Sequence, residues 1–157
     1  MNTKIDSLSI DLRKATEDKV SKFNLIRGKE STTPFWDIIV LSALDAAQKN
    51  LYEIQLKEKL ARKELPLSPT YHVFHDPVGV KVGNGGGVIS VIEDLQKIYN
   101  EDLKSKKVLI LLSGGYSQRL PSASLLGKVF TALPLGKIFS LIVALFLNFL
   151  LVCTNIQ

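Results

Sequence analysis

The sequence lacks two features of secreted proteins. Cys153 is its single cysteine, so an internal disulfide is excluded, which fits a reducing compartment. The first residues, MNTKIDSLSIDLRKATEDK, are polar and mixed in charge, whereas a secretory signal needs an apolar stretch. We therefore expect a cytoplasmic protein.

The chain also lacks a basic stripe interleaved with aromatic side chains. It carries 20 Lys and Arg against 15 Asp and Glu, with a formal charge of +5, which suits an anionic partner. The basic residues are scattered, so we expect no nucleic-acid partner. A hydrophobic share of 46% and a charged share of 22% predict one folded domain of ordinary size.

Two common nucleotide-binding motifs are missing. A Walker A loop needs Ser or Thr after its Lys, but Val129 follows Gly127-Lys128. A dinucleotide fingerprint needs Gly or Ala at Val88 and an acidic residue where Ser113 stands. Any phosphate site in this chain must therefore be built differently.

Hydrolase and metal motifs are weak as well. The string Gly115-Tyr116-Ser117-Gln118 resembles the start of a nucleophile elbow, but Arg119 replaces the final glycine and no His follows. His72 and His75 lie three residues apart on an expected strand, so they point to opposite faces and do not suit a shared ion. We expect no metal ligands among them.

Strands alternate with helices along the chain. Near-continuous apolar runs at 35–41 and 108–112 predict strands buried on both faces, and 71–74 predicts another. The hydrophobic spacing predicts an outer amphipathic helix over 5–28 that stops at Gly28, a helix over 45–64, and a helix whose inner face carries Val88, Val91, Ile92, Leu95 and Ile98. Between them Gly83–Gly87 is expected to be a loop. This order predicts an α/β fold with a mostly parallel sheet.

Two glycine-rich segments follow expected strands, so both are predicted at the sheet edge where ligands bind. In Ser113–Pro121, glycines let successive amides converge on phosphate oxygens, Ser117 adds a donor, Arg119 a fork of donors, and Lys128 a point charge. This string favours function over a simple turn. Gly83–Gly87 precedes a helix N-terminus, which favours anions, but a purely structural turn is an equal alternative.

Several strings resemble the fucose-1-phosphate guanylyltransferase (GDP-L-fucose pyrophosphorylase) family. The resemblance runs from about residue 10 to Gly136. It is carried by Phe35–Ile38, Arg62–Leu67, Tyr71–Phe74, Gly83–Gly86, Gly114–Pro121 and Leu126–Pro134.

The resemblance implies an incomplete GT-A-like (Rossmann-like) nucleotidyltransferase core, and a reaction of GTP with L-fucose 1-phosphate that gives GDP-L-fucose and pyrophosphate with Mg²⁺. By position, Gly114, Gly115 and Ser117 would bind the nucleotide phosphates. Arg119 and Lys128 would neutralise the leaving pyrophosphate and the α-phosphate. Gly85 and Gly86 would lie against the nucleotide. Transfer of this kind needs positioning and positive charge rather than a protein nucleophile.

The end of the chain departs from that family pattern. We divide the chain into an N-terminal helix (1–30), a partial nucleotidyltransferase domain (31–136) and an apolar tail (137–157) in which the family's acidic metal ligands are missing. We interpret the tail first as an aberrant end of a truncated, inactive chain and second as a buried helix. A membrane anchor over 138–153 is the least favoured alternative, because this segment is shorter than the roughly 20 apolar residues that a span requires. The rival hypothesis is a non-catalytic interaction protein or one tethered to a membrane by this tail.

Overall fold

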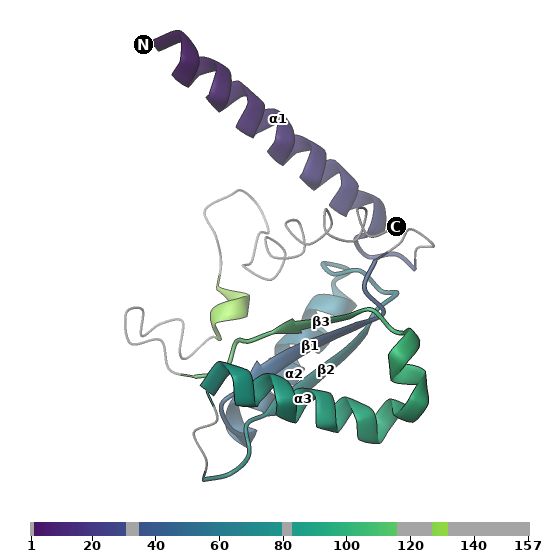
Figure 1. The fold of residues 1–157 in the computed structure, drawn as a ribbon. Helices are drawn as coiled ribbons and strands as arrows, with labels where there is room; N and C mark the ends of the chain where they lie inside the picture. Colours follow the sequence, from purple (N-terminus) through teal and green to yellow (C-terminus); the bar gives the residue numbers. More distant parts are fainter. Residues whose placement is uncertain (1, 31–34, 80–82, 116–126, 132–157) are drawn as a thin grey trace.

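The chain forms a small parallel sheet with helices on both of its faces (Figure 1). The structure is a computed structural model that describes residues 2–30, 35–79, 83–115 and 127–131. The sheet contains β1 (Ile38–Ala43), β2 (Thr70–His75) and β3 (Val108–Leu111). The helices are α1 (Asn2–Ile26), α2 (Ala46–Ala61) and α3 (Gly83–Tyr99), with the 3-10 turns η1 (Asn100–Ser105) and η2 (Lys128–Phe130). The predicted α/β class and parallel sheet are confirmed.

β1 is the central strand, in the order β2-β1-β3. All six of its residues are buried, as its continuous apolar run predicts. Leu41 is paired with Val73 on one side and with Leu111 on the other. The strand begins three residues later than the sequence predicts, and Phe35 before it is buried in the core.

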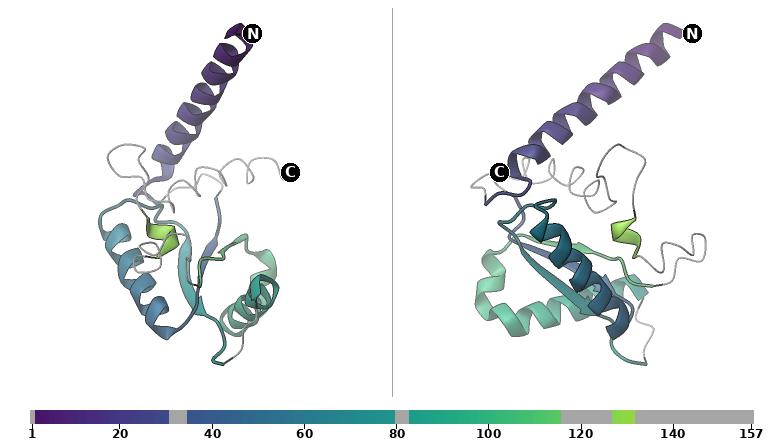
Figure 2. Two further views of the ribbon diagram at one scale, coloured as in Figure 1. Left: turned by 90° about the vertical axis from the view of Figure 1, so that its left-hand side faces the viewer. Right: turned by 180° about the vertical axis from the view of Figure 1, so that it is seen from behind.

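The two faces of the sheet have separate cores. Figure 2 shows α2 and α3 on opposite sides of the strands. On the α2 side, Ile39 and Leu41 of β1 pack with Tyr52 and Leu56 of α2. On the α3 side, Ile38 and Val40 pack with Val91 and Leu95. The period-2 alternation of strand side chains therefore sends β1 residues to two different cores.

The chain path creates a switch point between β1 and β3. From β1 it runs through α2 to β2, and then returns through α3 to β3 on the far side of β1. The two described connections thus run in opposite directions across the sheet, and the order of the strands reverses at β1, beside β3. Ligands of open α/β sheets bind outside the carboxyl ends at such points.

The prediction that Gly83–Gly87 is a loop is wrong, because these residues form the first turn of α3. The first amides of a helix need no partner within it, so a glycine run is tolerated there. Gly87, Val91 and Leu95 are buried at intervals of four, so they mark the inner face of the helix. Ile92 and Ile98, predicted on the inner face, are 44% and 50% exposed.

Among the α1 side chains from residue 10 onward, those of the last turns join the core. Phe23 and Ile26 are buried, whereas Leu12 is 61% exposed, and the helix projects away from the sheet (Figure 1). Gly28, at φ +65°, ends it by donating its N–H to the Leu65 carbonyl at 3.0 Å, so the predicted stop is confirmed. Within the described ranges no helix is long and apolar enough to cross a membrane, and the predicted segment 138–153 lies outside them.

Candidate functional site

A cavity lies at the carboxyl edge of the sheet, at the switch point. Its volume is about 190 Å³. Residues that follow all three strands line it, together with the start of α3: Ser42, Leu44, Asp76, Gly83, Asn84, Gly87, Leu112, Gly114 and Gly115. Both glycine segments singled out in the sequence thus meet at one cavity.

The start of α3 gives one wall a partial positive charge. The first turn has no acidic residue, and its glycines leave the backbone amides uncovered by side chains. Gly83 has φ +63°, and a Cβ built there would meet nothing within 4 Å. A ligand can therefore approach this backbone closely.

The two glycines after β3 have different roles. A Cβ on Gly114 would lie 2.9 Å from the carbonyl carbon of Ala43, so only glycine lets the loop pack against the end of β1. Gly115 has φ +97° and nothing within 4 Å of its Cβ position. Gly114 is thus a packing position, whereas Gly115 turns the chain beside open space.

Ser42 and Ser113 hold the start of this loop through paired hydrogen bonds. The Ser42 hydroxyl accepts the N–H of Ser113 at 3.0 Å and that of Gly114 at 3.3 Å. The Ser113 hydroxyl donates to the Ser42 carbonyl at 2.8 Å. Both side chains are buried, so these bonds exchange little with water.

Tyr52 connects the two ends of the segment 113–127. Its hydroxyl donates to the Ser113 carbonyl at 3.0 Å. Its ring meets the Phe130 ring edge to face, with 5.5 Å between the ring centroids. Burial raises the pKa of Tyr52, and the hydrogen bond to Ser113 offsets part of that effect. A Cβ on Gly127 would lie 2.4 Å from Tyr52 Cε1, so glycine is required here too.

Lys128 begins η2, directly after the contact between Gly127 and Tyr52. Val129 and Phe130 pack into the core on the α2 side of the sheet. Lys128 is half-buried, and no residue in the described ranges forms an ion pair with it. This cation lies at the end of the loop system, outside the set of residues that line the cavity.

Apart from Lys128, the predicted site residues divide into three groups. Gly114 and Gly115 line the cavity. Gly85 and Gly86 lie in the first turn of α3, between the lining residues Asn84 and Gly87. Ser117 and Arg119 lie outside the described residues.

Sequence reasoning missed two polar cavity residues, Ser42 and Asp76. Ser42 is the one polar residue in the apolar run of β1, and that interruption was its only local signal. The Asp76 carboxylate lies 3.6 Å from the Cβ position of Gly87, beside the positive start of α3. An anionic ligand would approach the glycine amides rather than this carboxylate.

The two histidines of β2 have hydrogen-bonding roles, and His75 alone lies at its carboxyl end. His72 Nε2 lies 2.8 Å from the Tyr99 hydroxyl, and its ring stacks on Phe74. His75 Nδ1 lies 2.8 Å from the Asp76 carbonyl oxygen. In the part of the chain that the structure describes, no group of three or more His, Cys, Asp or Glu side chains could hold a metal ion.

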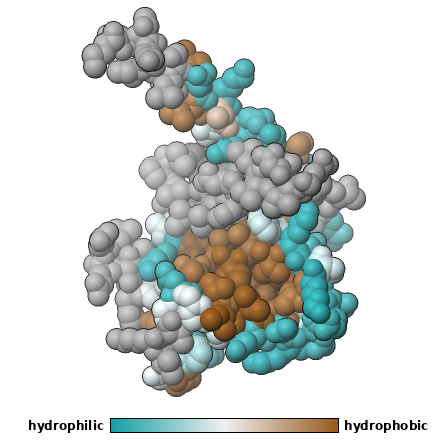
Figure 3. All heavy atoms as spheres, viewed as in Figure 1, coloured by the Kyte–Doolittle hydropathy of each residue, from teal (hydrophilic) through white to brown (hydrophobic). Residues whose placement is uncertain are grey.

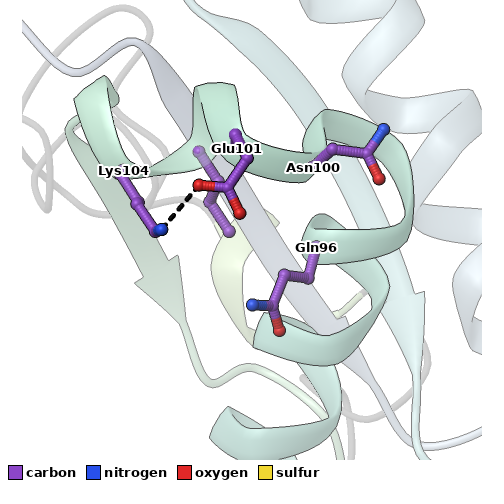
Figure 4. A pocket seen from close by; sticks show the side chains of 5 residues that line it. Gln96, Asn100, Glu101 and Lys104 are labelled. Atoms are coloured by element: carbon purple, nitrogen blue, oxygen red, sulfur yellow. Dashed lines mark hydrogen bonds and ion pairs between the residues drawn. The ribbon is translucent and has the colours of Figure 1, made fainter.

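A second cavity, of about 310 Å³, lies where α3 turns into η1 (Figure 4). Gln96, Asn100 and Glu101 surround it, and the Lys104 ammonium pairs with the Glu101 carboxylate at 2.5 Å. η1 precedes β3, so this cavity lies at the opposite edge of the sheet from the glycine segments. Its exposed charges already neutralise each other, so it offers no net positive charge to a phosphate.

Comparison with known proteins identifies the family. The model of the fucose pyrophosphorylase domain matches residues 100–156. Human fucose-1-phosphate guanylyltransferase is 51% identical over 132 residues, which make up 83% of this chain. The mouse enzyme is 50% identical over 80% of the chain. The chain belongs to the fucose-1-phosphate guanylyltransferase family.

The match to this enzyme family covers only part of the longer proteins. The chain spans about 22% of the human and mouse proteins. The bifunctional fucokinase/GDP-fucose pyrophosphorylase of Arabidopsis thaliana is 32% identical over 64% of the chain, which spans 12% of that protein. No solved structure matches. The match to the family model extends past Gly136 to residue 156. The domain boundary at Gly136 stays a prediction.

Proposed function

We propose that this chain binds the phosphates of GTP and takes part in forming GDP-L-fucose and pyrophosphate from GTP and L-fucose 1-phosphate. The observation that carries the proposal is that both glycine segments line one cavity at the switch point of the sheet. The relatives' names supply the reaction. In this proposal the three-stranded sheet is the first part of a GT-A-like core.

The residues suit phosphoryl-group chemistry. A sugar phosphate oxygen attacks the α-phosphorus and pyrophosphate leaves, so the protein must hold the reactants in line and stabilise negative charge. The amides of Gly115 and of the α3 start are donors for phosphate oxygens. Lys128, which has no ion-pair partner among the described residues, supplies positive charge, and Arg119 and Ser117 add donors as the family pattern implies.

In this proposal Mg²⁺ would be held by the phosphates and by one carboxylate of the cavity, because the acidic ligands that the family resemblance implies are missing from this chain. Magnesium in nucleotide sites is commonly held by one or two carboxylates together with phosphate oxygens. Asp76 is the carboxylate that lines the cavity, and no described residue donates to it. Asp76 would hold the ion, which would neutralise charge on the phosphates, so the carboxylate and the anion need not repel each other.

Calorimetric titration of the full 157-residue chain with GTP tests the proposal. We expect saturable binding that is strengthened by Mg²⁺, and binding about tenfold weaker, or ~1.4 kcal/mol, in Gly115→Ala, whose Cβ would project beside the phosphate path. Pyrophosphate release from GTP and L-fucose 1-phosphate then measures activity. Absence of GTP binding by the folded chain would refute the proposal.

Gly79→Ala is the matched control for Gly115→Ala. Gly79 also has a positive φ, +83°, and nothing within 4 Å of its Cβ position, but it does not line the cavity. Both substitutions should therefore lower stability by a similar amount, about 1 kcal/mol, because Ala is strained at positive φ. Equal loss of GTP affinity in both variants would show that strain, rather than contact with the ligand, causes the effect.

A further inference from the structure

We infer that Ser42 is a positioning residue that fixes where the phosphate-binding part of the glycine loop begins. This inference rests on the proposed function and assigns a new role within the same site. It is carried by the reciprocal hydrogen bonds between Ser42 and the start of the loop.

The first step is the end of the ladder between β1 and β3. The last paired residues are Leu41 and Leu111, so beyond them the backbone of β3 has lost its strand partner. The Ser42 hydroxyl replaces that partner, because it accepts the N–H groups of both Ser113 and Gly114. A side chain thus takes over from the backbone at the point where the chain must leave the sheet.

The second step concerns which amides remain for a ligand. With the N–H groups of Ser113 and Gly114 committed to Ser42, the first amide that can face a ligand belongs to Gly115. Gly115 lies beside open space at φ +97°. The Ser42 hydroxyl therefore decides which residue starts the phosphate-binding turn.

The third step is the cost of losing this anchor. Ser42 is 6% exposed and Ser113 is 4% exposed, so water cannot readily replace the hydroxyl. Without the hydroxyl, the buried N–H of Ser113 and the half-buried N–H of Gly114 lose their acceptor, which is unfavourable, and the loop would move to satisfy them. Movement there displaces Gly115 relative to the start of α3, which forms the opposite wall of the cavity.

An isosteric pair of variants tests the inference in the full chain. Ser42→Thr keeps the hydroxyl and Ser42→Val replaces it with a methyl group of the same shape, and both suit a strand. We expect Ser42→Val to bind GTP at least tenfold more weakly than the wild type, and Ser42→Thr to stay within about threefold. Hydrogen exchange measured by NMR should speed up at Ser113 and Gly114 in Ser42→Val alone.

Val91→Ala provides a stability control, because it removes core volume on the α3 side without touching the loop. Its GTP affinity should match the wild type at a temperature where all variants are folded. If Ser42→Val does not fold, Ser42→Ala takes its place in the comparison with Ser42→Thr. If the wild type binds GTP and Ser42→Val binds it as tightly as Ser42→Thr, the inference about Ser42 is wrong while the proposed function stands. If the wild type does not bind GTP, the proposed function and the inference are both wrong.

Discussion

Tyr52 couples the core to the glycine loop through a single hydroxyl. That hydroxyl donates to the buried Ser113 carbonyl at 3.0 Å. Tyr52→Phe removes the donor and leaves the carbonyl unsatisfied, so we expect a loss of about 1–3 kcal/mol in the free energy of unfolding. Urea denaturation measures this loss, and GTP titration should show weaker binding because the loop start is released.

Tyr71→Phe is the comparison for Tyr52→Phe. The Tyr71 hydroxyl donates to the Pro66 carbonyl at 2.9 Å, which is the same kind of bond at a distance from the loop. We expect a similar loss of stability and an unchanged GTP affinity. A fall in affinity for both variants would show that lower stability, rather than the Ser113 contact, weakens binding.

At the scale of elements, the local sequence predicts the strands and the start of α2 well and misses the start of α3. The run from Ile38 to Leu41 is apolar at every position and rich in β-branched residues, which favours a strand buried on both faces. The glycines from Gly83 to Gly87 satisfy a loop and a first helical turn equally, because neither needs side chains. In the structure they are helical, and Gly87 is the buried residue among them.

The sequence predicts where the candidate site lies on the sheet, but it does not predict the hydrogen bonds that hold the loop there. Gly114 and Gly115 follow the clearest strand, so the sheet edge was their expected place. The partner of Ser113 is 71 residues away in the chain, and nothing near Ser42 signals that pairing. Tertiary hydrogen bonds of this kind appear only once the strand order is known.

The first turn of α3 allows a test of the role assigned to Gly85. A Cβ there would meet nothing within 4 Å, and its φ lies outside the left-handed region. Gly85→Ala should raise the free energy of unfolding by about 0.5–1 kcal/mol, because alanine loses less backbone entropy in a helix. If Gly85 lies against the nucleotide, GTP affinity falls in the same variant, as titration would show. Higher stability with unchanged affinity would remove Gly85 from the site.

The far end of α3 is tied to β2 by a bond that depends on pH. His72 lies 2.8 Å from the Tyr99 hydroxyl, and burial lowers the pKa of His72 below its ordinary 6.5. The unfolded chain therefore binds more protons than the folded chain as the pH falls below 6.5. The contribution of neutral His72 to the free energy of unfolding is thus complete above that pH and is lost as the pH falls toward the folded-state pKa. Denaturation at pH 7.5 and 5.5 should show a smaller fall in stability for His72→Gln. An identical fall in both proteins would contradict this assignment.

For the whole molecule, the α3-side face of β3 is incompletely covered. Val108 and Ile110 point to this face and are half-buried, and Leu112 after them is 45% exposed. Figure 3 shows an apolar area on this face, with hydrophilic residues below it and beside it. Among the described strands β3 has one neighbour, β1, and the chain spans about 22% of its relatives. Apolar surface of this kind promotes association.

We therefore expect the chain to self-associate as its concentration rises, and Val108→Thr/Leu112→Thr to weaken that association at least severalfold. Sedimentation velocity at several concentrations measures the effect. Val78→Thr/Leu25→Thr makes the same two chemical changes at residues that are 92% and 63% exposed elsewhere, so it should associate like the wild type. Equal association in both double variants would mean that contacts between chains lie away from β3. Since the substituted positions are partly exposed, both variants should keep most of their stability, and any difference reports on the surface rather than on folding.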